Sequence, residues 1–289
     1  TMFHKLTKES SLFTFMHGVI AQLKQLGKVR TSETYTATLK SFMDFQDEQD
    51  VPLDGITSDM MLMYEAYLKT RELRMNTISF YMRNLRAVYN RAVEKGLTAQ
   101  QYPFRHVYTG VDKTVKRAIP IKAIKALKDL DLATNLTLDF ARDMFMFSFY
   151  TRGMSFVDMA YLKKTDLQNG MLTYRRRKTG QELSIKWEKC MAEIIAKYPE
   201  NKTGFLLPII KEQGDERRQY DNALHLVNYR LKELSTMLKL QRPLTMYVAR
   251  HSWASAAKAK NVPLSVISEG MGHDSEATTQ IYLASLETS

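Results

Sequence analysis

Apolar residues recur every three or four positions through four stretches of the first hundred residues, a spacing that places them on one face of a helix. The last of these stretches is the clearest and lies between Asn76 and Gly96. Gly27 and the turn-forming residues 52–55 separate the others. Because four helices of this length can bury one small core, we predict a helical domain over residues 1–105, with helices at 11–26, 31–46, 58–68 and 76–96.

The pattern changes after this domain. Residues 106–119 show no apolar period and are predicted to form a linker. Helical spacing resumes after Pro120, and residues 138–150 are so apolar that we expect a buried helix there. Residues 166–187 instead alternate between apolar and polar, with turn signals at Asn169-Gly170 and Thr179-Gly180, which is typical of a small antiparallel sheet. The prediction is a mainly α fold, with an α-rich second domain over residues 120–289 that carries this sheet.

Composition narrows the class of protein. The chain of 289 residues is 44% hydrophobic, as globular proteins are, and its net charge of +11 favours a polyanionic partner such as nucleic acid. Ribosomal and membrane-surface proteins share such a charge. No apolar run reaches the roughly twenty residues that span a bilayer, and the single Cys190 excludes an internal disulfide and fits a reducing cytoplasm. The histidines lack metal-site spacing and there is no phosphate-binding glycine loop, so we expect neither a metal nor a cofactor.

Polar residues are grouped at three places in the last forty-odd residues, each inside an apolar helical pattern. Tyr247 and Arg250 lie three positions apart and therefore share a helix face. Pro263 and Gly272 mark the start and the end of the next helix. Ser275 is placed to cap the helix that carries Tyr282.

The motif Tyr247-x-x-Arg250-His251-Ser252-x-Ala254, followed by Met271-Gly272-His273 and, nine residues later, by Tyr282, resembles the tyrosine recombinase (phage integrase) family. Residues 152–158 and the tyrosine at position 247 are similar to the branch of integrases carried by conjugative transposons. The resemblance implies a four-helix, SAM-like core-binding domain that clamps duplex DNA, followed by a catalytic domain. It also implies site-specific cleavage and rejoining of DNA, for integration and excision of a mobile element, by four protomers assembled on double-stranded DNA.

The residue types suit phosphodiester chemistry without a metal. The phenolic oxygen of Tyr282 can attack phosphorus and form a 3′-phosphotyrosyl ester. Arg250 offers a planar charged fork for two phosphate oxygens, and His273 can donate a hydrogen bond to the same phosphate. By resemblance, Lys178 in the hairpin turn is the lysine that protonates the leaving 5′ oxygen. The alternative for Lys178 is a solvent-exposed turn residue.

Two positions depart from the family pattern. Ser155 stands where the family has its first arginine, and we expect Arg152, three residues earlier, to supply that guanidinium from a shifted position. The alternative is that Arg152 only caps the preceding helix. Tyr247 replaces a histidine or lysine; a phenol with a pKa of about 10 is a poor base at neutral pH, so we expect Tyr247 to orient the phosphate or Tyr282. Asp158 is expected to take the supporting role of the family's glutamate.

Other basic residues are candidates for DNA contact, although for those on the fourth helix a solvated helix face is an equally good explanation. They are Lys113, Lys116 and Arg117 in the linker, Arg175 and Arg177 in the hairpin, and Arg83 and Arg86 on the fourth helix. The family branch has an N-terminal arm-binding domain and a C-terminal tail that we do not find here, so we expect a truncated form. It should be mostly monomeric off DNA, and we expect a location in the bacterial cytoplasm at the nucleoid, away from membranes.

Three other functions compete with recombination. A DNA-binding regulator of the same fold with weak catalysis would explain the two departures from the motif. A type IB topoisomerase shares the chemistry, but the four-helix first domain and the short chain speak against it. A helical RNA-binding protein is suggested by charge alone. The sequence does not reveal the target site.

Overall fold

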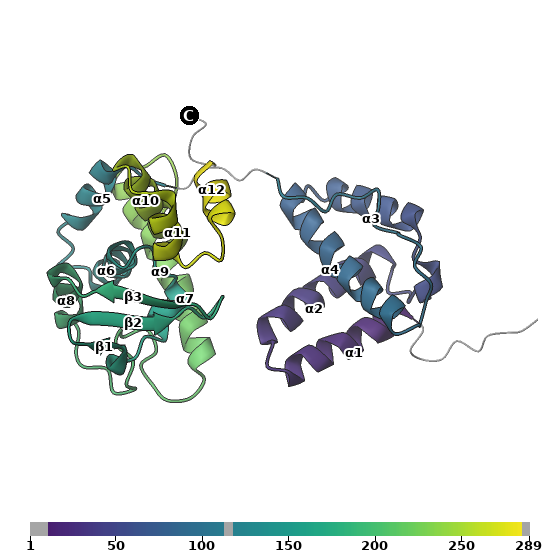
Figure 1. Ribbon diagram of the computed structural model, residues 1–289, viewed down its shortest axis with the longest axis horizontal. Coiled ribbons are helices and arrows are strands. Elements are labelled where there is room, and N and C mark those ends of the chain that lie inside the picture. Colours follow the sequence, from purple (N-terminus) through teal and green to yellow (C-terminus); the bar gives the residue numbers. More distant parts are fainter. Residues whose placement is uncertain (1–10, 113–117, 285–289) are drawn as a thin grey trace, which may run out of the picture. The chain divides into compact units, whose positions relative to one another are not determined.

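The computed structural model describes residues 11–112 and 118–284, except for the side chains of Ile281, Tyr282 and Ala284. The chain divides into two compact units, Thr1–Lys113 and Thr114–Ser289 (Figure 1). Each unit has its own hydrophobic core. The boundary between them falls inside the segment predicted as a linker.

Helices build the first unit: α1 (Leu12–Gln25), α2 (Val29–Phe45), α3 (Ser58–Thr70) and α4 (Met75–Glu94), with a short 3-10 turn at Leu53–Gly55. The apolar stripe of α4 faces the core, as its spacing predicts. Ser58 and Asn76, the first residues of the predicted third and fourth helices, are residue types that commonly cap a helix, but neither does so here. Thr57 caps α3, because its hydroxyl accepts the N–H of Met60. Asn76 exchanges hydrogen bonds with the backbone of Asp112 instead of capping α4.

The first part of the predicted linker packs on this helical unit. Val107 is buried in its core. Glu65, itself buried, accepts the N–H of Tyr108 at 2.7 Å and pairs with Lys69. The hydroxyl of Ser79 donates to the carbonyl of Gly110 at 2.5 Å. Residues 106–112 therefore complete the helical unit, and the chain leaves it only after Asp112.

The second unit surrounds one buried helix. It contains α5 (Ile121–Lys128), α6 (Leu136–Tyr150), α7 (Phe156–Ala160), α8 (Lys189–Ala196), α9 (Glu216–Met237), α10 (Met246–Ala259), α11 (Leu264–Met271) and α12 (Glu276–Ala284). Helix α6 packs against α5, α8, α9 and α10. Four consecutive residues of α6, 144–147, are buried, so the strongly apolar stretch forms the central helix that its composition predicts.

The small sheet has the order β1-β2-β3, with both pairs antiparallel: β1 (Leu167–Gln168), β2 (Met171–Arg175) and β3 (Glu182–Lys186) (Figure 1). Leu172 and Tyr174 of β2 face the core together with Leu183 and Ile185 of β3. The mainly α fold with a small antiparallel sheet is thus confirmed. The turn between β2 and β3 carries residues 176–181.

No helix among the described residues has the length and hydropathy needed to cross a membrane. Within the same part of the chain, no three His, Cys, Asp or Glu side chains are grouped as metal ligands would be.

Candidate active site

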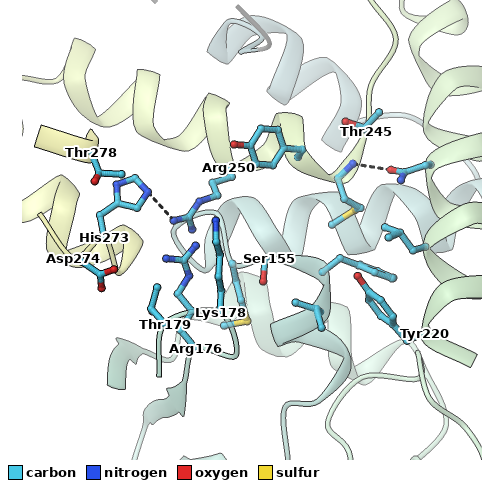
Figure 2. A pocket seen from close by; sticks show the side chains of 17 residues that line it. Ser155, Arg176, Lys178, Thr179, Tyr220, Thr245, Arg250, His273, Asp274 and Thr278 are labelled. Atoms are coloured by element: carbon cyan, nitrogen blue, oxygen red, sulfur yellow. Dashed lines mark hydrogen bonds between the residues drawn. The ribbon is translucent and has the colours of Figure 1, made fainter. Parts of the chain in front are cut away.

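A cavity of about 650 Å³ opens in the second unit where α7, α9, α10 and the β2–β3 turn meet the segment that leads into α12. The ends of Arg250, Arg176 and Lys178 converge on it, with the ring of His273 to one side (Figure 2). Among the lining residues that the structure describes, these three are cationic and only Asp274 is acidic. The cavity is therefore suited to an oxyanion.

Arg250 is fixed by the backbone around it. It lies on α10 and is only 6% exposed. Its Nη1 donates to the carbonyl of Gly153 at 3.0 Å, and its Nη2 donates to the carbonyl of Met271 at 2.6 Å. A Cβ at Gly153, whose φ is +72°, would lie 2.6 Å from the Cα of Arg250. The glycine thus lets the turn after α6 approach α10 closely enough to hold the guanidinium.

His273 connects Arg250 to α12. Its Nε2 is 3.2 Å from Nη2 of Arg250, and its Nδ1 is 2.8 Å from the hydroxyl oxygen of Thr279. Burial, followed by the charges of Arg250, Arg176 and Lys178, lowers the pKa of His273 to about 4. The imidazole is therefore neutral at physiological pH in the free protein.

Arg176 is a site residue that the sequence analysis missed. It is 8% exposed, and its Nη1 donates to the carbonyl of Gly272 at 2.5 Å. Its Nε is buried and has no hydrogen-bond partner among the described residues. The signal was present in the two-residue period of β2, because Arg176 follows Leu172 and Tyr174 on the buried face.

The turn that carries Arg176 and Lys178 is anchored at the residue between them. Asp158 is buried and accepts the backbone N–H of Arg177 at 2.8 Å. The hydroxyl of Ser155 donates to the other carboxylate oxygen of Asp158 at 2.6 Å and caps α7. Ser155, which replaces the family's first arginine, thus belongs to the support of the hairpin.

Lys178 and Tyr247 both line the cavity. Lys178 is exposed at the turn. Tyr247 lies in the first turn of α10, is 49% exposed and contacts the ring of His251 edge-on at 4.6 Å. Its partial exposure leaves the phenol accessible from the cavity.

Arg152 does not line this cavity. It lines a separate one of about 420 Å³, together with Trp253 and Lys260. Its backbone is left-handed, with φ of +61°, in the turn that follows α6. The structure thus groups Arg250, His273, Lys178 and Tyr247 of the predicted residues, and it adds Arg176 in the place expected for Arg152.

Tyr282 lies on α12, but its side chain is outside the described part of the chain. The contacts of α12 with the rest of the second unit are described on both sides of Tyr282. Ser275 caps it by accepting the N–H of Thr278, as predicted. Leu283 packs with Ala254, Ile267 and Met271. These contacts hold the helix of Tyr282 beside the segment of His273.

The residues predicted to contact DNA differ in their surroundings. Arg175 pairs with Glu182 at 3.1 Å, and the guanidinium of Arg177 stacks 3.9 Å above the ring of Tyr161. Arg83 and Arg86 are exposed on α4. Lys113, Lys116 and Arg117 lie outside the described residues.

Two family models match this architecture. The phage integrase SAM-like domain matches residues 11–107, and the phage integrase family matches residues 130–288, which is more than half of the chain. The chain belongs to the phage integrase family, the tyrosine recombinases. By its family, it is a DNA recombinase that acts in site-specific recombination.

This tyrosine recombinase is 22% identical over 257 residues to tyrosine recombinase XerC of Leptospira interrogans, covering 88% of this chain and 82% of XerC. It is 25% identical over 253 residues to XerA of Thermococcus kodakarensis, covering 81% and 88%. Its fold is similar to that of lambda integrase in a dimer bound to a COC′ core site, with a TM-score of 0.71 and 15% identity over 96% of this chain and 97% of the integrase chain. The Tn1549 transposon integrase in complex with a circular intermediate DNA gives a TM-score of 0.66 and 14% identity over 93% and 94%.

Proposed function

We propose that this recombinase cleaves and rejoins double-stranded DNA through a 3′-phosphotyrosyl ester on Tyr282, without a metal ion, during integration and excision of a mobile element. The observation that carries the proposal is the convergence of Arg250, Arg176, His273 and Lys178 on one cavity. The similarity to lambda integrase and to the Tn1549 integrase, both solved with DNA, supports the DNA substrate and the mobile element.

Arg250 and Arg176 neutralise the scissile phosphate in this proposal. Both are buried and oriented by backbone carbonyls, so they need little rearrangement when charge develops on the non-bridging oxygens. Arg176 takes the role that the sequence analysis assigned to Arg152. The motif therefore keeps two guanidinium groups, although its usual first arginine is a serine.

The reaction then needs two proton transfers. The hydroxyl of Tyr282 loses its proton to water as its oxygen bonds to phosphorus, and the bond from phosphorus to the 5′ oxygen breaks. Lys178 gives a proton to that 5′ oxygen. A negative phosphate raises the pKa of His273 from its low value in the free protein, which allows Nε2 to donate to a phosphate oxygen. Tyr247 orients the phosphate by donating a hydrogen bond from its phenolic hydroxyl. Attack of a 5′ hydroxyl on the phosphotyrosine reverses the steps and rejoins the strand.

Recombination also requires assembly. Lambda integrase has been solved as a tetramer bound to a Holliday junction, at a TM-score of 0.66. We propose that this chain likewise acts as a tetramer on DNA and is mostly monomeric without it. The basic residues at 83, 86, 113, 116, 117, 175 and 177 are proposed DNA contacts.

A covalent-adduct assay tests the function. Fragments bound by Tyr282→Phe would first be selected from random DNA, and the selected site would then be made as a duplex with a nick next to the scissile phosphate. Wild-type protein should become covalently linked to this duplex in excess EDTA, and Tyr282→Phe should not. Binding without an adduct would identify a DNA-binding regulator, and relaxation of supercoiled DNA without strand exchange would identify a topoisomerase.

A further inference from the structure

A buried hydroxyl on α12 reaches the imidazole of the active site. Thr279 is 0% exposed, and its Oγ1 lies 2.8 Å from Nδ1 of His273. Tyr282 follows Thr279 by three residues on the same helix, which is about one turn. Leu283, one residue further, packs against α10 and α11. The helix therefore meets its unit through a polar contact at the cavity and an apolar contact beside it.

The direction of these hydrogen bonds follows from the chemistry of the partners. A guanidinium has donors only, so Nε2 of His273 must accept from Arg250. In a neutral imidazole the other nitrogen then carries the hydrogen. Nδ1–H of His273 therefore donates to the hydroxyl of Thr279.

This hydroxyl is an acceptor that suits both protonation states of His273. In the imidazolium, Nδ1–H still donates to Thr279, while Nε2–H becomes free to donate to a phosphate oxygen. The charges that face the ring are Arg250 of α10, Arg176 and Lys178 of the hairpin, and Asp274. The three cations oppose protonation, so the ring needs both the phosphate and a fixed acceptor at Nδ1 to become a donor.

We propose that Thr279 is a positioning residue, which accepts Nδ1–H of His273, directs Nε2 toward Arg250 and the phosphate, and holds the helix of Tyr282 in register with the site. This inference rests on the proposed function. Thr279 acts through His273.

Two substitutions separate the hydroxyl from the volume of the side chain. Thr279→Val keeps the volume and removes the acceptor, whereas Thr279→Ser keeps the acceptor. We expect the rate of adduct formation by Thr279→Val at neutral pH to fall about 10- to 100-fold, by analogy with the loss of a partner that orients a metal-ligating histidine. Thr279→Ser should stay within about 3-fold of wild type, and the Kd for the same duplex within about 2-fold for both, because the cations remain. Thr236→Val, the same change at an exposed position of α9, should alter neither quantity.

Two further readouts exclude a packing role. In protein labelled with ¹⁵N-histidine, with His273→Gln to assign the signals, the free wild type should show the Nδ1–H tautomer. Thr279→Val should keep this tautomer, because Arg250 still donates to Nε2, but the Nδ1–H proton signal should move upfield as its hydrogen bond is lost. The pH profile of cleavage by Thr279→Val should move to lower pH, because the imidazolium has lost the acceptor for Nδ1–H. A Thr279→Val variant with the wild-type rate would overturn the proposal. So would a slower variant whose Nδ1–H signal and pH profile are both unchanged.

The same measurements distinguish this inference from the proposed function. If the wild type forms no adduct, the proposed function fails, while the Nδ1–H signal of the free protein still decides the contact. An upfield move of this proton signal in Thr279→Val would support the contact, and an unchanged signal would overturn it.

Discussion

Burial and orientation separate the arginines near the cavity. Arg250 and Arg176 are both less than a tenth exposed, and both donate to backbone carbonyls at the cavity wall. Arg152 lines a different cavity beside Trp253. A guanidinium stabilises a transition state only when it is held near the developing charge. Mutation of Arg250 or Arg176 should therefore lower the rate of cleavage more than mutation of Arg152.

We predict that Arg176→Ala lowers the rate of adduct formation by about 10²- to 10³-fold, the loss typical when one oriented donor is removed from such a site. Arg152→Ala should lower it by less than about 10-fold. The rates are measured at saturating protein on the nicked duplex, with Arg250→Ala as the reference for a lost guanidinium. Equal losses for the two variants would contradict this distinction, and a larger loss for Arg152→Ala would return the role to Arg152.

The titration of His273 predicts a pH dependence of stability. Its pKa is lowered from 6.5 to about 4 by burial and by neighbouring cations. Between these values the unfolded chain binds a proton that the folded protein does not, so stability is fully present above about pH 6.5 and falls as the pH drops toward 4. Fluorescence of Trp187 and Trp253, both in the second unit, reports urea unfolding at each pH. His273→Gln should flatten this part of the profile, whereas His225→Gln, at an exposed position, should leave it as in wild type.

Some elements are held together by side chains and close approaches that local sequence patterns do not predict. The turn after α6 approaches α10 because position 153 is a glycine. Asp143 of α6 accepts from Tyr198 and pairs with Lys197, both directly after α8, and it also pairs with its neighbour Arg142. Apart from the pair with Arg142, these contacts join residues that are distant in sequence. Each therefore gives a prediction about stability with a matched control elsewhere in the same unit.

For the glycine, we predict that Gly153→Ala costs at least about 3 kcal/mol and abolishes cleavage, because the new Cβ meets the backbone of Arg250 in addition to the left-handed strain. Gly170 has φ of +73°, close to the +72° of Gly153, and nothing lies within 4 Å of its added Cβ. Gly170→Ala should therefore cost only about 1 kcal/mol. Urea unfolding followed by tryptophan fluorescence measures both. Similar losses at the two positions would show that strain alone, without the clash, explains the effect.

For the ion pairs, we predict that Asp143→Ala costs about 3–5 kcal/mol, because the carboxylate is buried and its partners lose their acceptor. Lys189 on α8 instead pairs with Glu193 at an exposed position, with side chains 90% and 63% exposed. Lys189→Ala should cost at most about 0.5 kcal/mol. The same fluorescence assay compares them, and a small loss for Asp143→Ala would contradict a structural role for the network.

Local patterns predicted the elements well because helix and strand periods are properties of neighbouring residues. The stripe of α4 and the alternation of β2 were readable in this way. Arg176 was missed because it stands in a run of three arginines. Its charge suggested a side chain exposed to solvent, although the two-residue period of β2 places it on the buried face. The close approach at Gly153 joins residues almost a hundred positions apart, so no local pattern contains it. The resemblance predicted a supporting role for Asp158, but the group it supports, the backbone N–H of Arg177, is distant in sequence and is hidden for the same reason.

At the scale of the whole molecule, the division into two units determines which segments can be separated. Residues 106–112 lack helical spacing, yet they pack on the helical unit through Val107, Tyr108 and Gly110. The stability of that unit should therefore depend on where it is cut.

We predict that a fragment ending at residue 112 is more stable than one ending at 105 by about 3–5 kcal/mol, from hydrogen bonds near 1 kcal/mol each and the burial of one valine. The buried carboxylate of Glu65 adds to the loss, because it keeps Lys69 but not the N–H of Tyr108. Urea unfolding followed by helical circular dichroism measures the difference. In the longer fragment, Glu65→Gln should lower stability and so reproduce part of the loss seen on shortening. Fragments of equal stability would show that residues 106–112 are dispensable.

The gathering of Arg250, Arg176 and Lys178 around one cavity has a consequence for the protein before it meets DNA. Like charges held close together repel, and that repulsion weakens the native state of the empty enzyme. A phosphate adds negative charge to that of Asp274, so the substrate also stabilises the folded protein by binding to it. A substitution that removes one of these charges would stabilise the DNA-free protein but weaken catalysis. The lower stability without DNA and the reactivity with DNA therefore have the same cause.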